Sequence, residues 1–436
     1  MDDIKILKGN IIYAKTKDEF EICEHGYLVC KDGKVEGIYQ TLPFRLGGEP
    51  IEDHGDCLII PGMTDLHIHA PQYTFRGTGM DLELLEWLET NTFPEEAKYK
   101  DVLYANEAYA KFAKNLKHSS TTRACVFGTI HRRSTLVLMD HLERSGLVTM
   151  VGKVNMDRNS PDELREGTQE SAEETVEWMK DVQHKKYKNT LPILTPRFIP
   201  SCTDELMENL KKIQLHFLLD MLKMVQMRYQ IPVQSHLSEN LSEIEWVKEL
   251  CPYAEFYGDA YDHFGLFGAD APTVMAHCVY STEEEIQRMK ENGVYVAHCP
   301  ESNENLSSGI APVKRYLEEG LSVGLGSDVA GGSTENLFRA MAHAIQMSKM
   351  RWRLVDQKYP ALKSEEVFYM ATKGGGSFFG KVGSFEEGYE FDAVVLDDSR
   401  LESSRQMSVK DRLERMIYLA DEREVKAKYV RGNKII

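Results

Sequence analysis

Short apolar runs alternate with amphipathic segments along the middle of this chain. There are eight such runs, and most are β-branched or apolar throughout, which is typical of parallel strands buried on both faces. The segments between them repeat apolar positions at helical spacing, for example in 171–185, 203–228 and 282–292. Several begin with Ser or Thr and carry acidic residues in the first turn, as helix N-termini do. The eight runs are 63–69, 121–127, 147–154, 192–198, 231–236, 272–278, 293–299 and 321–328.

This alternation predicts an α/β fold, a TIM-like (β/α)8 barrel. An open doubly wound sheet stays an alternative, because the strand count alone does not establish closure. The two chain ends instead carry short alternating runs, the pattern of hairpins in an antiparallel sheet. We predict that residues 1–60 and 388–436 together form one small β-sandwich domain, and that residues 61–387 form the barrel.

Composition and charge narrow the class of protein. Of 436 residues, 42% are hydrophobic and 28% charged, as in globular proteins. The formal net charge of −17 argues against a nucleic-acid partner, which would require clustered Lys and Arg. We see no apolar stretch of the ~18 residues that a membrane helix needs and no secretory leader, so we expect no membrane partner and a cytoplasmic location.

The cysteines exclude one alternative enzyme scaffold. Eight cysteines are spread along the chain, and no pair has C-x-x-C spacing. We therefore expect buried, reduced thiols. The zinc deaminases that use an H-x-E motif with P-C-x-x-C do not fit this sequence.

Polar side chains gather where the predicted strands end. Catalytic residues of a barrel lie at the carboxyl ends of its strands, so these positions are candidates for one shared site. His67 and His69 are two residues apart, which places both imidazoles on the same face of the first strand. The others are Arg197 after the fourth strand, His236 and Glu239 after the fifth, His277 after the sixth, His298 after the seventh and Asp328 after the eighth.

This constellation suits one divalent cation. His67, His69 and His236 with the carboxylate of Asp328 would give three nitrogen ligands and one oxygen ligand, with a position left for water. Such a set favours zinc, and iron is an alternative. The water on such an ion has a pKa of about 7. Glu239 is close to His236 in sequence without being needed as a ligand, which fits general acid–base catalysis.

Six segments in order resemble the amidohydrolase superfamily, in its mononuclear deaminase branch. They are PGMTDLHIHA, QSHLSEN, VMAHC, VAHCPESN, GLGSDVAGG and GYEFDAVVLDD. The resemblance implies metal ligation by the four residues just named. It also implies that His277 contacts the attacking hydroxide and the tetrahedral intermediate, that Glu239 shuttles protons, and that Asp328 accepts the proton of the water. The region TPRFIPS lacks the lysine that bridges two metals in binuclear relatives, so a single ion is expected.

Further segments are similar to the members of this superfamily that act on guanine, among them HIHAPQYTFRGTGMDLELLEWLETNTFP and LTPRFIPSC. That similarity implies hydrolysis of guanine to xanthine and ammonia, a homodimer, and substrate binding by Gln72, Arg197 and Phe198. The chemistry agrees: a Gln amide reads an amide-like edge in both directions, Arg donates to a carbonyl or ring nitrogen, and Phe covers a ring. One departure is Glu301, where relatives often carry a neutral residue.

Three questions stay open on the sequence. The substrate could be another N-heterocycle, such as a thioadenosine, pterin or triazine, and the reaction could be dechlorination. A catalytically dead assembly protein is a remote alternative, because the ligand positions and Glu239 are all present. Finally, residues 81–93 carry an apolar stripe at Leu82, Leu85 and Leu88 that could either cap the site or only pack on the barrel rim.

Overall fold

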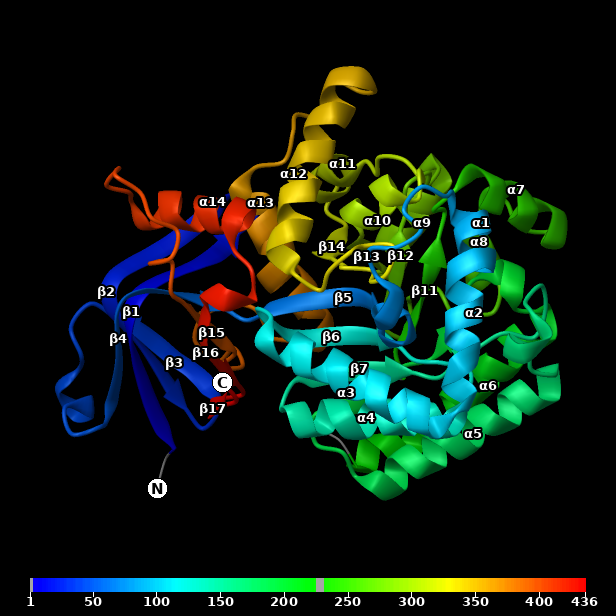
Figure 1. Ribbon diagram of the computed structural model, residues 1–436, viewed down its shortest axis with the longest axis horizontal. Coiled ribbons are helices and arrows are strands. Elements are labelled where there is room, and N and C mark those ends of the chain that lie inside the picture. Colours follow the sequence, from blue (N-terminus) through cyan, green and yellow to red (C-terminus); the bar gives the residue numbers. More distant parts are fainter. Residues whose placement is uncertain (1–2, 225–230) are drawn as a thin grey trace.

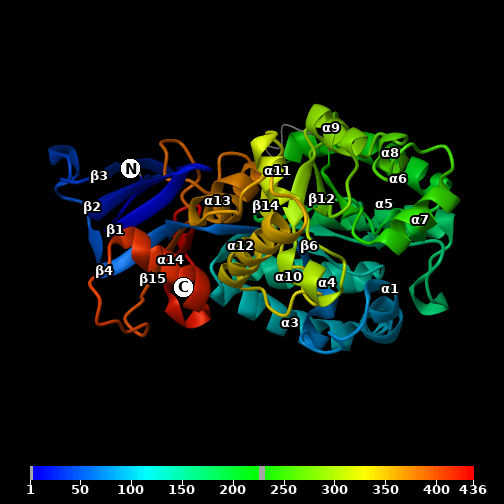
Figure 2. The same ribbon diagram turned by 90° about the horizontal axis from the view of Figure 1, so that it is seen from above.

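The protein consists of a large barrel and a smaller β-sheet that lies beside it (Figure 1). The structure is a computed structural model that describes residues 3–224 and 231–436. The smaller sheet contains the strands from both ends of the chain, and the chain crosses into the barrel along β5 (Figures 1 and 2). Both ends therefore pack against the same side of the barrel.

Eight parallel strands form the barrel, in the order β11-β12-β13-β14-β5-β6-β7-β9. The sheet closes where Leu194 pairs with Val233: the Leu194 amide donates to the Pro232 carbonyl at 2.9 Å, and the Gln234 amide donates to Leu194 at 3.0 Å. The predicted barrel is therefore confirmed and the open sheet is excluded. Its strands are β5 (Met63–His69), β6 (Thr121–Phe127), β7 (Val148–Gly152), β9 (Thr190–Pro192), β11 (Val233–Leu237), β12 (Thr273–His277), β13 (Tyr295–His298) and β14 (Ser322–Leu325). The short strands β8 (Val154–Asn155) and β10 (Thr195–Pro196) pair beside it.

Helices cover the outside of the barrel, and their ends follow local sequence rules. In α9 the Thr282 hydroxyl accepts from the Glu285 amide at the N-terminus, and Gly293 ends the helix with φ of 66°. The predicted helix 203–228 corresponds to α6, and its residues 225–228 lie outside the described residues. The helices are α1 (Leu84–Trp87), α2 (Phe93–Glu96), α3 (Val102–His118), α4 (Arg132–Ser145), α5 (Thr168–Lys185), α6 (Asp204–Met224), α7 (Leu241–Leu250), α8 (Asp259–Asp262), α9 (Glu283–Asn292), α10 (Pro300–Asn305), α11 (Val313–Glu318), α12 (Leu337–Leu354), α13 (Ser364–Tyr369) and α14 (Val409–Leu419).

The smaller sheet has seven strands in the order β17-β16-β15-β4-β1-β2-β3. Its neighbours pair antiparallel as predicted, except that β1 and β4 are parallel, because the chain crosses over after β3 and returns on the other side of β1. The sheet curls until the Val35 amide donates to Tyr389 and the Phe391 amide to Gly33, both at 2.8 Å. The strands are β1 (Ile4–Thr16), β2 (Glu19–Lys31), β3 (Lys34–Tyr39), β4 (Ile51–Pro61), β15 (Ala393–Leu396), β16 (Val425–Val430) and β17 (Asn433–Lys434).

Alternation along β4 divides its side chains between two cores. Leu58 and Ile60 join the core of the barrel, whereas Cys57 and Ile59 pack inside the curled sheet. The strand β4 thus contributes apolar side chains to both cores and holds the small sheet against the barrel. The boundaries that we predict at residues 60/61 and 387/388 stay a prediction.

A buried arginine adds a polar link between the two parts. The Arg123 guanidinium, at the start of β6, donates to Asp392 at 2.6 Å and to Glu390 at 2.8 Å, just before β15. Arg123 is 1% exposed and Asp392 is equally inaccessible. Among the described helices, none combines the length and the apolar character that crossing a membrane requires.

Candidate active site

Five polar side chains meet at one end of the barrel. His67 and His69 come from the carboxyl end of β5, His236 from β11, His277 from β12, and Asp328 from the segment after β14. His277 and Asp328 have φ of 73° and 46°, a left-handed conformation that non-glycine residues seldom adopt. The chain therefore turns sharply at both strand ends, which is common where side chains are held for function.

The spacing of these side chains fits one small cation. The Nε2 atom of His69 lies 3.1 Å from Nε2 of His67 and 3.2 Å from Nε2 of His236. Asp328 Oδ1 lies 3.2 Å from His67 Nε2 and 3.4 Å from His69 Nε2. In a tetrahedral zinc site with bonds of about 2.0–2.1 Å, neighbouring ligand atoms are about 3.3–3.4 Å apart. His69 is therefore at a separation suited to zinc from each of the other three predicted ligands, and His67 is likewise from Asp328.

The protonation of the histidines also suits metal binding. Burial lowers the pKa of His67, and lowers the pKa of His69 and His236 well below its usual range, so all three imidazoles are neutral. The Nδ1 atom of His236 lies 2.6 Å from the Arg197 carbonyl. Because that oxygen can only accept, the His236 proton is on Nδ1 and its Nε2 lone pair is directed at the other imidazoles.

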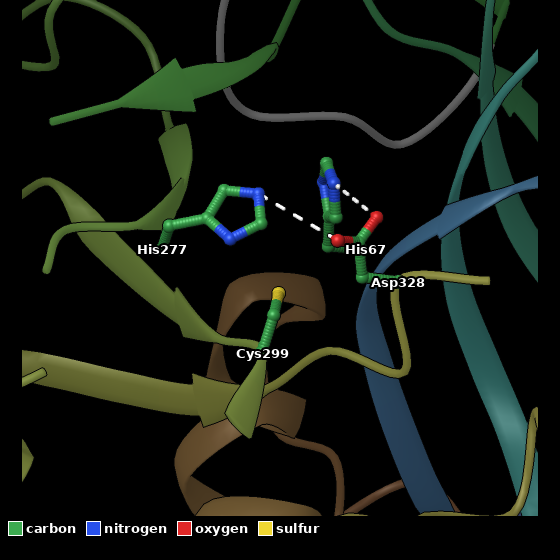
Figure 3. Close-up of side chains that lie close together, drawn as sticks. All are labelled: His67, His277, Cys299 and Asp328. Atoms are coloured by element: carbon green, nitrogen blue, oxygen red, sulfur yellow. Dashed lines mark ion pairs between the residues drawn. The ribbon is translucent and has the colours of Figure 1, made fainter. Parts of the chain in front are cut away.

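A second group of potential ligands overlaps the first, and Figure 3 shows it: His67, His277, Cys299 and Asp328. Burial raises the pKa of the Cys299 thiol well above its usual range, so it keeps its proton, and a thiol is a poor ligand. Burial alone would raise the pKa of Asp328, but His67 and His277 outweigh it and the net shift is downward. Asp328 is thus the anionic member of the group.

His277 and Glu239 form a pair beside the potential ligands. The Nδ1 atom of His277 lies 2.9 Å from Asn303 Oδ1, and its Nε2 atom lies 3.4 Å from Glu239 Oε2. Burial raises the pKa of Glu239 to about 7, and the Ser308 hydroxyl donates to its other oxygen at 3.0 Å. Glu239 can therefore exchange a proton near neutral pH.

His69, His236, His277, Glu239 and Asp328 line one cavity. One wall is apolar and comes from the predicted segment 81–93, through Leu84, Trp87 and Leu88. That segment therefore lines the cavity, through Leu88 of the predicted stripe, whereas Leu82 and Leu85 pack on the core. The reason is that α1 begins only at Leu84, so Leu82 precedes the helix, and Leu84, Trp87 and Leu88 share one helical face. The cap stays a prediction.

The sequence of residues 58–435 matches the amidohydrolase family. The chain belongs to this family. It is 39% identical to a guanine deaminase of Dictyostelium discoideum, over 99% of this chain and 98% of the relative. It is 38% identical to the guanine deaminase of Mus musculus, over 86% of this chain and 82% of the relative. A crystal structure of guanine deaminase from C. acetobutylicum, with guanine bound in the active site, superposes with a TM-score of 0.93 at 48% identity and covers both chains completely.

In this amidohydrolase, Gln72, Arg197 and Phe198, which the resemblance implies as substrate-binding residues, all line the cavity. The Gln72 amide is held on both sides, since its oxygen accepts from the Ala330 amide at 3.1 Å and its nitrogen donates to Glu96 at 2.9 Å. Arg197 also donates to Glu96, at 2.6 Å. Glu96 was not among the predicted site residues. The only signal was two consecutive acidic residues directly after an apolar segment, and nothing in that spacing points to Arg197.

Two further residues of the sequence prediction lie outside the cluster. His298 neither lines the cavity nor joins either group of potential ligands in the described part of the chain, and burial lowers its pKa to about 3. The unusual Glu301 accepts from the Ser333 hydroxyl at 2.6 Å and lies 3.0 Å from Arg339. It therefore links α10 to α12 and to the segment before that helix.

Proposed function

We propose that this amidohydrolase hydrolyses guanine to xanthine and ammonia. The observation that carries the proposal is the composition of the cavity: Gln72, Arg197 and Phe198 line it together with His69, His236, His277, Asp328 and Glu239. The similarity to guanine deaminases over nearly the whole chain supports the same substrate.

We assign one zinc ion per chain to His67, His69, His236 and Asp328, with iron as the alternative metal. The neutral imidazoles and their spacing of 3.1–3.2 Å support this assignment. When bound, such an ion acts as a Lewis acid that makes a water molecule acidic at neutral pH. Cys299 and His277 are left out of the ligand set, because the one is a protonated thiol and the other is committed to Asn303 and Glu239.

The side chains of the protein then move the protons. Asp328 accepts a proton from the water that adds to C2 of guanine, and Glu239 delivers a proton to the ring nitrogen next to C2. His277, 3.4 Å from Glu239 and 3.7 Å from Asp328, donates a hydrogen bond to the oxygen that develops at C2. The proton on Asp328 then passes to the amino group at C2, and Glu239 takes back the proton of the C2 hydroxyl. Ammonia leaves, the oxygen becomes the C2 carbonyl of xanthine, and both carboxyl groups return to their starting states.

Gln72, Arg197 and Phe198 orient the base for this step. Gln72 keeps one N–H and one oxygen lone pair unused by Glu96 and Ala330, enough to pair with a donor–acceptor edge. Arg197 offers only donors and therefore meets the carbonyl or the ring nitrogens on the far side of guanine. The Phe198 ring, buried at the cavity wall, covers a face of the purine.

Glu239→Gln tests the assignment of the proton shuttle. Because general acid–base catalysis contributes about 10²–10⁴-fold, kcat for guanine should fall by that factor, with zinc content unchanged. The fall in ultraviolet absorbance of guanine measures the rate. Glu285→Gln is the matched control: it is a buried carboxylate that accepts from Ser238 and Gly258, outside the cavity, and should retain kcat. An unaffected Glu239→Gln enzyme would overturn the proton-shuttle role.

Substrate and metal are tested separately. A panel of guanine, a thioadenosine, a pterin and a chlorotriazine at one enzyme concentration should give the highest kcat/KM for guanine, and a preference for any other compound refutes the proposal. Metal analysis should find about one zinc per chain, which a chelator removes together with activity and added zinc restores. Iron instead of zinc in freshly purified protein would change the metal assignment only.

We also propose a cytoplasmic homodimer. All eight cysteines are free, and seven of them are buried, which suits a reducing compartment. The end of α12, which projects from the barrel, exposes Met350, Trp352, Leu354 and Val355 (Figure 1). Trp352→Glu should convert the dimer to a monomer in sedimentation analysis, whereas a wild-type monomer would contradict the dimer.

A further inference from the structure

A buried carboxylate connects the two residues that we propose to read the base. Glu96 Oε1 accepts from Gln72 Nε2 at 2.9 Å, and Glu96 Oε2 accepts from Arg197 Nη1 at 2.6 Å. Glu96 and Arg197 are each 3% exposed and Gln72 is 2% exposed. Glu96 does not itself line the cavity, so it acts from behind the two side chains that do.

The surroundings of Glu96 make this arrangement specific. Glu96 ends the short helix α2, and Phe93 of the same turn lies under the Arg197 guanidinium at 5.4 Å from the ring centroid. Arg197 is thus fixed by a carboxylate and by an aromatic face from one turn of chain. The far side of the Gln72 amide is fixed by the Ala330 amide, so its oxygen and nitrogen have a defined orientation.

We propose that Glu96 is a positioning residue that sets the specificity of the site for a purine with an oxygen at position 6. The inference rests on the proposed function. The two carboxylate oxygens of Glu96 are both acceptors, so Gln72 must direct its amide nitrogen, and not its amide oxygen, toward Glu96. The same carboxylate holds Arg197 with its remaining donors toward the cavity, and it balances the buried positive charge so that a neutral base can bind there.

Glu96→Gln breaks this arrangement while preserving its shape. An amide presents one acceptor and one donor, so it can bind Arg197 or Gln72 but places an N–H group against the other. We expect kcat/KM for guanine to fall about 10- to 100-fold, mainly through KM, since hydrogen bonds to a charged group are lost. The metal-binding candidates are untouched, so zinc content and the midpoint of thermal unfolding measure whether the enzyme remains intact.

A second substrate separates specificity from general damage. 2,6-Diaminopurine keeps the amino group at C2 but carries a donor at position 6, which Arg197 cannot bind. Glu96→Gln should therefore change kcat/KM for 2,6-diaminopurine by less than about 3-fold, and the ratio of guanine to 2,6-diaminopurine activity should fall. A purely structural defect would lower kcat/KM for both substrates by the same factor and leave their ratio constant. That result would overturn the inference.

Glu95 provides a matched control in the same turn. It is also buried, and it accepts from Thr74 at 2.6 Å, from Lys98 at 2.7 Å and from Tyr104. Glu95→Gln should carry a similar stability cost and keep the substrate ratio within about 2-fold of wild type. If Glu95→Gln lowers the ratio as much as Glu96→Gln, the special role of Glu96 is refuted.

Two further variants test the inference with guanine alone, in case Glu96→Gln does not fold or 2,6-diaminopurine gives no measurable activity. Glu96→Asp keeps the charge but withdraws the carboxylate by about 1.5 Å, so it should raise KM for guanine less than Glu96→Gln. In the Arg197→Met background, Glu96→Gln should have little additional effect on KM, because Glu96 acts through Arg197. Fully additive effects would overturn the inference. Wild-type protein that leaves guanine unchanged would instead refute the proposed function itself.

Discussion

Arg123 offers a quantitative test of how the small sheet is attached to the barrel. Its guanidinium is 1% exposed and donates to Asp392 at 2.6 Å and to Glu390 at 2.8 Å. Arg123→Met replaces it with an apolar side chain of similar length and leaves the buried Asp392 without its cationic partner. We expect the variant to be destabilised, because an unpaired charge in the interior costs more than the missing hydrogen bonds.

The neighbouring groups set the size of this effect. Breaking a buried ion pair by removing one partner costs about 3–5 kcal/mol. Asp392 keeps the Arg431 backbone amide at 2.8 Å, and the half-buried Glu390 keeps the Arg431 side chain at 2.7 Å. Only one oxygen of Asp392 is therefore left unpaired, which places the expected cost near the lower end, at about 3 kcal/mol. For 436 residues that unfold together, that corresponds to a fall in the unfolding midpoint of roughly 3 °C.

Two companion variants identify the cause. Arg123→Met combined with Asp392→Asn removes the unpaired charge but keeps an acceptor for Arg431, so it should recover at least about 1 kcal/mol. Arg132→Met is the control: Arg132 also contacts two acidic residues, Asp181 and Glu174, but on a partly exposed helix surface, so it should cost less than about 1 kcal/mol.

Urea unfolding followed by circular dichroism and tryptophan fluorescence gives the free energies, and coincidence of the two signals tests whether the barrel and the sheet unfold together. Guanine turnover at 25 °C should be unchanged, because Arg123 is at the opposite end of β6 from the cavity. An Arg123→Met variant as stable as wild type would refute the role of this ion pair. A lower free energy of unfolding for the double variant with Asp392→Asn than for Arg123→Met alone would refute it as well.

Two other predictions concern the cavity cap and a surface ion pair. Trp87→Ala removes a buried wall of the cavity, so KM for guanine should rise by about 10-fold with kcat within about 3-fold, and an unchanged KM would show that 81–93 only packs on the rim. His343 lies 2.7 Å from Glu304, whose carboxylate raises the pKa of the imidazole above its ordinary value of 6.5. Protonated His343 therefore stabilises the fold below pH 6.5, and this contribution disappears as pH rises through the higher folded pKa. His343→Gln should lower the midpoint of thermal unfolding at pH 5.5 but leave it unchanged at pH 9, and an equal loss at both values would contradict the ion pair.

The sequence by itself determined seven barrel strands and the residues at their ends, whereas the fourth predicted run, 192–198, meets β9 only at Pro192. Period and composition place each buried run, and in a parallel barrel every strand presents its carboxyl end at the same rim. His67, His69, His236, His277 and Asp328 could therefore be grouped before any contact was known, and the structure brings all five together. His298 satisfied the same rule but does not join them, because the rule fixes which end of the barrel a residue occupies and not where its side chain points.

Only the tertiary structure decided the pairings between distant segments. Glu96 contacts Arg197, which lies 101 positions further along the sequence, and β1 pairs in parallel with β4. Packing of the whole chain brings these segments together, and no local sequence pattern encodes either pairing. The start of α1 at Leu84 likewise decided that Leu84 and Trp87 line the cavity in place of the predicted Leu82 and Leu85. Local periodicity specifies the face of an element, whereas the partner on that face depends on how all the elements pack.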